Sequence, residues 1–115
     1  MSKYLLLMYQ PAGPEPSADE IREEWPKWAK FEEDIMGAEV YLDNNGLART
    51  DSATTVRVRD GERQVTDGPF AETKEYLAGY FLIDVDDLDA ALDWAARIPS
   101  AEYGSVEVRP MWGES

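Results

Sequence analysis

Two segments of this chain carry apolar side chains on both sides of an extended strand, and no other feature constrains the fold as much. In residues 4–9 the two alternating sets are Tyr4, Leu6 and Met8, and Leu5, Leu7 and Tyr9. In residues 76–85 they are Tyr76, Ala78, Tyr80 and Leu82, and Leu77, Phe81, Ile83 and Val85. Apolar residues on both faces are typical of a central strand that is covered on two sides. We therefore expect both segments in the middle of one sheet.

A helix is predicted over residues 18–36. Ser17 and Glu20 form a capping box at its start, and Gly37 is expected to end it. An apolar stripe at helical spacing consists of Ile21, Trp25, Trp28, Ala29, Ile35 and Met36. Pro26 interrupts the pattern, so we expect either a kink or a short first helix that ends near Trp25.

A second helix is predicted over residues 87–97. Asp86 is expected to cap it, and Pro99 stops it. Its apolar stripe consists of Leu88, Ala91, Leu92 and Ala95.

The remaining extended segments are shorter. Residues 39–42 are predicted as a strand that ends in a turn at residues 43–46. Residues 53–59 and 62–66 alternate around Asp60-Gly61, which is a strong signal for a β-hairpin turn. The last strand is predicted over residues 105–109, with alternating polar side chains that are typical of a sheet edge.

This order of elements predicts an α+β fold of the ferredoxin-like type, βαββαβ, with an antiparallel sheet, an inserted hairpin and a single domain over residues 1–115. Two helices cover only one face of a four-stranded sheet. The other face would expose one apolar set from each central strand, and exposed apolar surface of this size favours association. We therefore expect an isologous homodimer in which two sheets pack face to face.

Composition narrows the function classes. The net charge is −13, which repels nucleic acid and anionic membranes. The chain has no cysteine and no histidine, so it lacks the commonest catalytic and metal-binding side chains. The apolar run of residues 4–9 is too short for a signal sequence or a membrane span. We expect a cytoplasmic protein without metal or cofactor, and we interpret the aspartates between residues 84 and 89 as helix-capping residues rather than a calcium loop.

Several segments resemble a known family. They are residues 53–57 (ATTVR), 65–75 (VTDGPFAETKE), 78–83, 87–99 and 104–110. They match in order over nearly the whole chain, and they resemble the DGPF-domain branch of the YCII-related family. The resemblance implies a dimeric α+β barrel, in which two ferredoxin-like subunits pair their sheets. It also suggests an extracytoplasmic-function sigma factor as a regulatory partner.

The chain departs from this family in two respects. The better-known YCII-like members are associated with a His–Asp pair proposed to act in catalysis, and no histidine is present here to take that role. Relatives tend to be glycine-rich ahead of the ATTVR strand, where this chain has Tyr41 and Leu42, which would narrow a cleft.

Candidate binding residues fall within or near residues 49–74, a segment with equal numbers of basic and acidic residues in an otherwise acidic chain. Arg57 and Arg59 share a strand face. They are placed either to clamp an anionic small molecule or to pair with acidic residues across the hairpin. With Asp67 and Tyr80, we expect them to line a cleft beside the ATTVR hairpin and the DGPF loop.

Without histidine, the candidate catalytic acid–base groups are carboxylates and tyrosines. Asp67 precedes the stiff Gly68-Pro69 pair and either serves a ligand or bonds the local backbone. Asp84 either faces the barrel interior or caps the following loop. The leading hypothesis is a small-molecule binding or accessory protein. The alternatives are a cofactor-independent enzyme of unknown reaction and a regulatory partner of a sigma factor.

Overall fold

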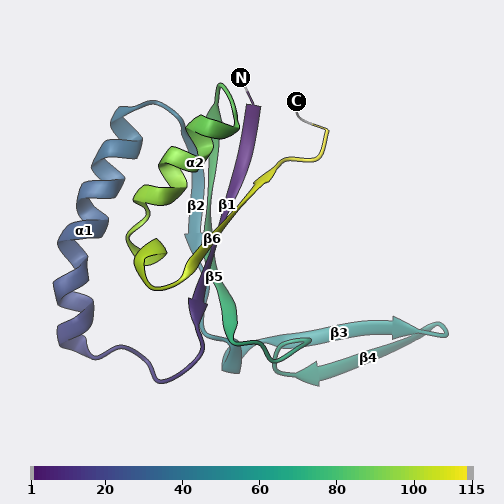
Figure 1. Ribbon diagram of the computed structural model, residues 1–115. Coiled ribbons are helices and arrows are strands. Elements are labelled where there is room, and N and C mark those ends of the chain that lie inside the picture. The colour runs from purple at the N-terminus through teal and green to yellow at the C-terminus, as the bar shows by residue number, and fades with distance from the viewer. Residues whose placement is uncertain (1, 114–115) are drawn as a thin grey trace.

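The computed structural model describes residues 2–113 as a mixed α+β fold (Figure 1). Its main sheet contains β1 (Ser2–Pro11), β2 (Tyr41–Gly46), β5 (Glu75–Val85) and β6 (Ser105–Pro110), in the order β2-β5-β1-β6. All three adjacent pairs are antiparallel. One helix follows β1 and another follows β5, which is the ferredoxin-like arrangement. The predicted fold class is confirmed.

The two strands that are apolar on both faces, β1 and β5, are the central strands, as predicted. Leu6 lies opposite Phe81, and Tyr4 lies opposite Ile83, on the face that the helices cover. The alternate residues of both strands lie on the other face, which no helix covers (Figure 1). We call this second face the open face.

Helix α1 (Ala18–Gly37) begins at the predicted capping box. The Glu20 backbone N–H donates to Ser17 Oγ at 3.1 Å, and the Ser17 N–H donates to Glu20 Oε1 at 3.0 Å. The alternative of a helix that ends near Trp25 is wrong, because α1 continues through Pro26. Pro26 is exposed, so water can reach the carbonyl of Arg22, which loses its intrahelical partner.

The end of α1 and its buried face differ from the prediction. Gly37 is still helical, and the backbone takes a positive φ of 62° at Glu39 instead. Phe31, which the predicted stripe omits, is buried together with Ile35, whereas Trp25 is 70% exposed. Only the C-terminal half of α1 therefore contributes buried residues to the core.

The prediction of a turn at residues 43–46 is wrong, since these residues continue β2 and pair with residues 79–82 of β5. The close approach depends on Gly79. A Cβ atom there would lie 2.6 Å from the Asn45 carbonyl oxygen and 3.1 Å from Gly46 Cα. Pairing with a central strand outweighs the local turn preference of the Asp-Asn-Asn-Gly sequence.

The predicted hairpin is confirmed as β3 (Thr54–Arg59) and β4 (Glu62–Asp67), which form a separate two-stranded sheet. Asp60 and Gly61 at its turn have φ values of 53° and 77°. Positive φ at both central residues is typical of the type I′ turn, which suits the twist of a hairpin. The hairpin projects away from the main sheet on the side opposite the helices (Figure 1). We call residues 54–67 the arm.

Helix α2 (Leu88–Arg97) is capped by Asp87 and not by Asp86 as predicted. The Asp87 side chain accepts a hydrogen bond from the Ala90 N–H at 2.9 Å. Asp87 has an extended backbone and so directs its carboxylate at the first turn of the helix.

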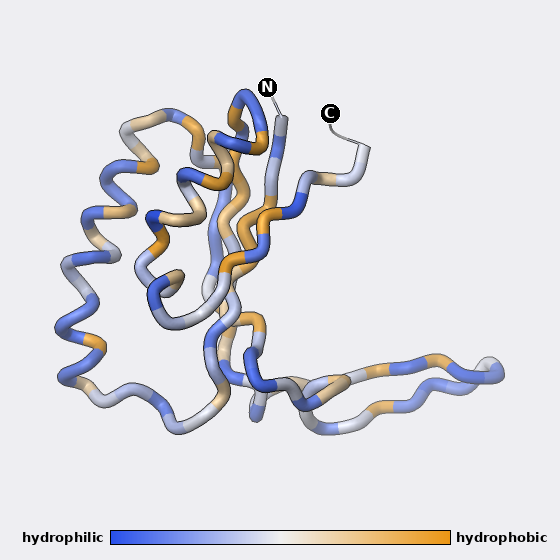
Figure 2. The backbone as a smooth tube through the Cα atoms, viewed as in Figure 1, coloured by the Kyte–Doolittle hydropathy of each residue, from blue (hydrophilic) through white to orange (hydrophobic). Residues whose placement is uncertain are grey.

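The core lies between the helices and one face of the main sheet. Its fully buried members include Leu6, Ile35 and Ile83. Figure 2 shows hydrophobic residues concentrated along the central strands. Helix α2 packs on the sheet through small residues, and its predicted core leucines are about half exposed. Within residues 2–113, no helix is both long enough and apolar enough to cross a membrane.

Candidate functional site

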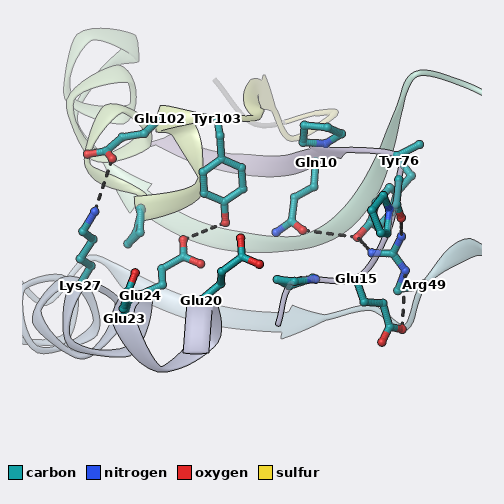
Figure 3. A pocket seen from close by; sticks show the side chains of 16 residues that line it. Gln10, Glu15, Glu20, Glu23, Glu24, Lys27, Arg49, Tyr76, Glu102 and Tyr103 are labelled. Carbon is teal, nitrogen blue, oxygen red and sulfur yellow. Dashed lines mark hydrogen bonds and ion pairs between the residues drawn. The ribbon is translucent and has the colours of Figure 1, made fainter. Parts of the chain in front are cut away.

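A cavity of about 680 Å³ lies between the N-terminal half of α1, the end of β1 and the short 3-10 helix η2 (Pro99–Glu102) (Figure 3). Its size is typical of small-molecule sites. The chain between β1 and α1, residues 12–17, forms one wall. Two prolines stiffen this segment. Because the first half of α1 buries no side chain in the core, its polar residues are available to the cavity.

One side of this cavity is acidic. Glu20, Glu23 and Glu24 come from the first turns of α1, and Tyr103 approaches them from the segment after η2 (Figure 3). The Tyr103 hydroxyl donates a hydrogen bond to Glu24 Oε1 at 2.8 Å. Desolvation and the Glu24 carboxylate raise the pKa of Tyr103, so this hydroxyl remains a donor even at pH values where a free tyrosine ionises. The pKa of Glu20 is lowered by its hydrogen bond from the Ser17 backbone.

The opposite end is organised by Arg49. Its guanidinium lies 5.3 Å from the centroid of the Tyr76 ring and donates to the Tyr76 hydroxyl at 3.1 Å. It also donates to the Gly13 carbonyl oxygen and lies 3.8 Å from a carboxylate oxygen of Glu15. The Tyr76 hydroxyl in turn lies 3.4 Å from Gln10 Oε1. This end therefore already holds one cation, in an aromatic and carbonyl-lined setting.

Acidic groups outnumber basic ones around the cavity. Among residues 2–113, its lining includes five glutamates, Glu15, Glu20, Glu23, Glu24 and Glu102, but only two basic residues, Lys27 and Arg49. Lys27 pairs with Glu102 at 3.6 Å. The cavity is thus suited to a molecule with a positive charge, because carboxylates accept hydrogen bonds from ammonium and amidinium groups and attract their charge.

A second cavity of about 360 Å³ lies beside the DGPF loop. Gly68 and Pro69 line it, together with Thr50 and Asp51 of the short 3-10 helix η1 (Thr50–Ser52). Ala12 and Tyr76 line both cavities. Tyr76 therefore stands between the larger cavity and the DGPF loop.

The two predicted arginines lie on the arm. Arg57 donates to the carbonyl oxygen of Phe70 at 3.2 Å, and Arg59 donates to that of Val58 at 3.1 Å. Arg57 therefore bonds the DGPF loop itself. Neither arginine lines either of these two cavities.

The other predicted residues are dispersed. Asp67 is the last residue of β4 and is exposed. Tyr80 lies on the open face, where its hydroxyl donates to Asp43 Oδ2 at 2.8 Å and accepts from Asn45 Nδ2 at 3.1 Å. Asp84 is also on the open face, and its Oδ1 is buried with no hydrogen-bond partner among residues 2–113. The structure does not bring Tyr80 and the arm arginines into one of these cavities.

The glutamates of α1 and Tyr103 were not predicted from the sequence. A signal for the first group was present, because Glu20, Glu23 and Glu24 recur at spacings of three and four and so share one side of a helix. Tyr103 carries no such signal. It reaches Glu24 from 79 positions along the chain, through tertiary structure alone.

The chain is similar to known proteins over much of its length. The chain is 52% identical over 67 residues to "Uncharacterized protein R00369" of Rhizobium meliloti (strain 1021), and this match covers 56% of the chain and 54% of that protein. The chain thus spans about half the length of this curated relative. A family model described as YCII-related domain matches residues 2–114. With that match over nearly its whole length, the chain belongs to the YCII-related family.

Proposed function

We propose that this YCII-related protein binds a small molecule with a positively charged group in the cavity between α1 and β1. The observation that carries the proposal is the charge of the lining, where five glutamates face two basic side chains around about 680 Å³. A concave site lined by one sign of charge concentrates ligands of the opposite sign. The volume suits an organic cation, since it greatly exceeds that of a single ion.

Arg49 illustrates how such a cation is held. Its guanidinium contacts a tyrosine ring, a tyrosine hydroxyl, a carbonyl and a carboxylate. The acidic end offers similar groups in Tyr103, Glu23 and Glu24 (Figure 3). An ammonium or amidinium group at this end would meet carboxylates and an aromatic side chain, the two partners that organic cations favour.

We expect the uncharged part of the ligand to extend past Tyr76 towards the second cavity. That cavity lies beside the DGPF loop, but its lining contains none of the four residues predicted to form a cleft there, Arg57, Arg59, Asp67 and Tyr80. The lining of the larger cavity favours a cation over the anion suggested by Arg57 and Arg59.

Three molecules of the same shape test the charge preference: benzamidine, benzamide and benzoate. We expect benzamidine alone to bind in calorimetry, and its amide chemical-shift changes to map to the cavity lining. Glu23→Gln with Glu24→Gln should weaken benzamidine binding by about tenfold, because two carboxylates are lost. Glu32→Gln with Glu33→Gln is the matched control, since both residues are exposed on α1 and outside the cavity lining. Equal losses in both variants would mean general attraction to an acidic chain and would contradict the proposal.

We also propose that the protein is a homodimer that pairs its open faces. Leu5 lies opposite Leu82 on this face, and Leu7 lies opposite Tyr80. Apolar side chains on a face that no helix covers favour association with a second copy. The unpartnered Oδ1 of Asp84 lies on the same face, where a donor from another molecule would lower the cost of its burial.

A further inference from the structure

The arm has one apolar face. Val56 lies opposite Val65 in the β3–β4 register, and Val58 follows on the same face. These three side chains are 60%, 54% and 63% exposed. Figure 2 shows the hydrophobic positions alternating with hydrophilic ones along the arm. The arm thus has the pattern of a strand pair that buries one side, yet none of these valines belongs to the hydrophobic core of the described residues.

Within residues 2–113, the hydrogen bonds that fasten the arm to its own subunit lie near its base. The Gly68 N–H donates to the Ala53 carbonyl oxygen at 2.7 Å, and Thr55 Oγ1 donates to that of Gly68 at 2.8 Å. Arg57 bonds the carbonyl of Phe70. Beyond these contacts β3 and β4 contact chiefly each other. Since an isolated two-stranded hairpin is marginally stable in water, the outer part of the arm needs a second surface.

The direction of the arm indicates where that surface lies. The helices cover one side of the main sheet, and the arm projects from the other side, where the open face lies (Figure 1). The radius of gyration is 16.3 Å, compared with roughly 13 Å expected for a compact chain of this length. A molecule seated on the open face would therefore lie alongside the arm.

The charge distribution favours a second copy of this chain as the molecule that lies on the open face and alongside the arm. The chain carries −13, so two copies repel each other through most of their surface. The arm is an exception, because residues 54–67 contain three arginines and three acidic residues. Its neutral, valine-bearing surface is where a second acidic copy can approach at the lowest electrostatic cost.

From these observations we propose that the arm of each protomer packs its valine face against the body of the partner in a symmetric dimer. The proposal rests on the homodimer proposed above and adds a second contact to the open face. Two-fold symmetry makes the contact reciprocal, so both arms are buried by one association. Each arm is then exchanged between the protomers as a clasp, and its valine face is buried only in the dimer.

Sedimentation equilibrium on the full chain tests the clasp. Val56→Glu with Val65→Glu places two charges on the valine face, and we expect the dimer dissociation constant to rise by about 100-fold. The matched control is Gln64→Glu with Thr66→Glu, which adds the same charge to the same hairpin on its opposite face. We expect this control to change the constant by less than about threefold. Far-UV circular dichroism checks that both variants fold, as expected for positions outside the core.

A nitroxide label gives a second readout. The chain has no cysteine, so Glu62→Cys, next to the arm tip, provides a unique attachment site. Labelled protein is mixed with isotope-labelled wild-type protein, and we expect the nitroxide to broaden amide signals in the body of the other copy. Broadening confined to arm residues, or its absence, would overturn the clasp.

The outcomes separate the two proposals. A species of 13.0 kDa at every concentration would overturn the homodimer and the clasp together, and it would also arise if the arm served a partner of another sequence. A stable dimer that the valine variant leaves unchanged would overturn the clasp alone. A dimer weakened by the valine variant and not by the control supports both.

Discussion

Arg97 at the end of α2 donates a hydrogen bond to Asp34 of α1, and Lys30 donates to the same carboxylate at 2.9 Å. The Arg97 guanidinium also lies 4.6 Å from the centroid of the Trp94 ring. These contacts join the two helices. Asp34 is thus the polar link between elements that are 63 residues apart in the sequence.

Asp34→Asn should make stability less dependent on pH. The hydrogen bond from Lys30, with the charges of Lys30 and Arg97, lowers the pKa of Asp34 below its ordinary value. A carboxylate with a lowered pKa stabilises the fold at pH values above its unfolded pKa, and this contribution is lost as the pH falls through the folded pKa. We expect the wild type to be the more stable at neutral pH and the difference to shrink below about pH 4.

Urea denaturation at a series of pH values measures this difference. Asp93→Asn is the control, since Asp93 is an exposed carboxylate on α2. A difference for Asp34→Asn that stays constant from neutral to strongly acidic pH would count against the ion-pair account.

Phe31→Ala should cost about 3–5 kcal/mol of the free energy of unfolding, because it leaves a large cavity in the core. Phe31 is 3% exposed, and its ring meets those of Phe81 and Trp94 edge to face, with centroids 5.2 and 6.2 Å away. Trp25→Ala on the same helix should change stability by less than about 0.5 kcal/mol. Urea denaturation at one fixed protein concentration compares the two variants. Equal losses in the free energy of unfolding would mean that Trp25 packs inward, as the predicted stripe has it.

Those parts of the fold that depend on local pattern were predictable from the sequence. The alternating apolar residues of β1 and β5 identify central strands, because side-chain direction alternates regardless of the partner. The Asp60-Gly61 turn follows equally from local chemistry. The strand at residues 43–46 was not predictable in this way. Its pairing with β5 is a tertiary interaction that overrides a turn-like sequence.

The candidate site could not be predicted from local sequence pattern in the same way. The main cavity depends on where α1 lies relative to β1 and η2, and no local pattern encodes that position. Glu24 and Tyr103 meet only because the chain folds back on itself. Arg57 and Arg59, which were predicted to bind a ligand, lie on the arm, because strand alternation fixes their face but not the neighbours of the hairpin.

Gly104→Ala should destabilise the protein by about 1–3 kcal/mol through overpacking. A Cβ atom at this position would lie 2.2 Å from the Tyr9 carbonyl oxygen and 3.2 Å from the Ser100 carbonyl oxygen, both of which belong to the backbone and cannot rotate away. Gly37→Ala meets no atom within 4 Å, so it should stabilise α1 by up to about 1 kcal/mol. Thermal and urea denaturation should therefore shift in opposite directions for the two variants.

Asp87→Ala should cost about 1 kcal/mol of the free energy of unfolding, because the first turn of α2 loses its capping acceptor. The Asp87 carboxylate accepts the Ala90 N–H at 2.9 Å, and no other side chain caps this helix in the described residues. Asp86→Ala, one position earlier and also exposed, should change stability by less than about 0.5 kcal/mol. Asp87→Asn separates the two contributions of the cap, since an amide oxygen keeps the hydrogen bond but loses the charge at the helix N-terminus. Denaturation curves compare the variants. If Asp86→Ala destabilises the protein more than Asp87→Ala does, the cap of α2 is Asp86, as the sequence pattern predicts.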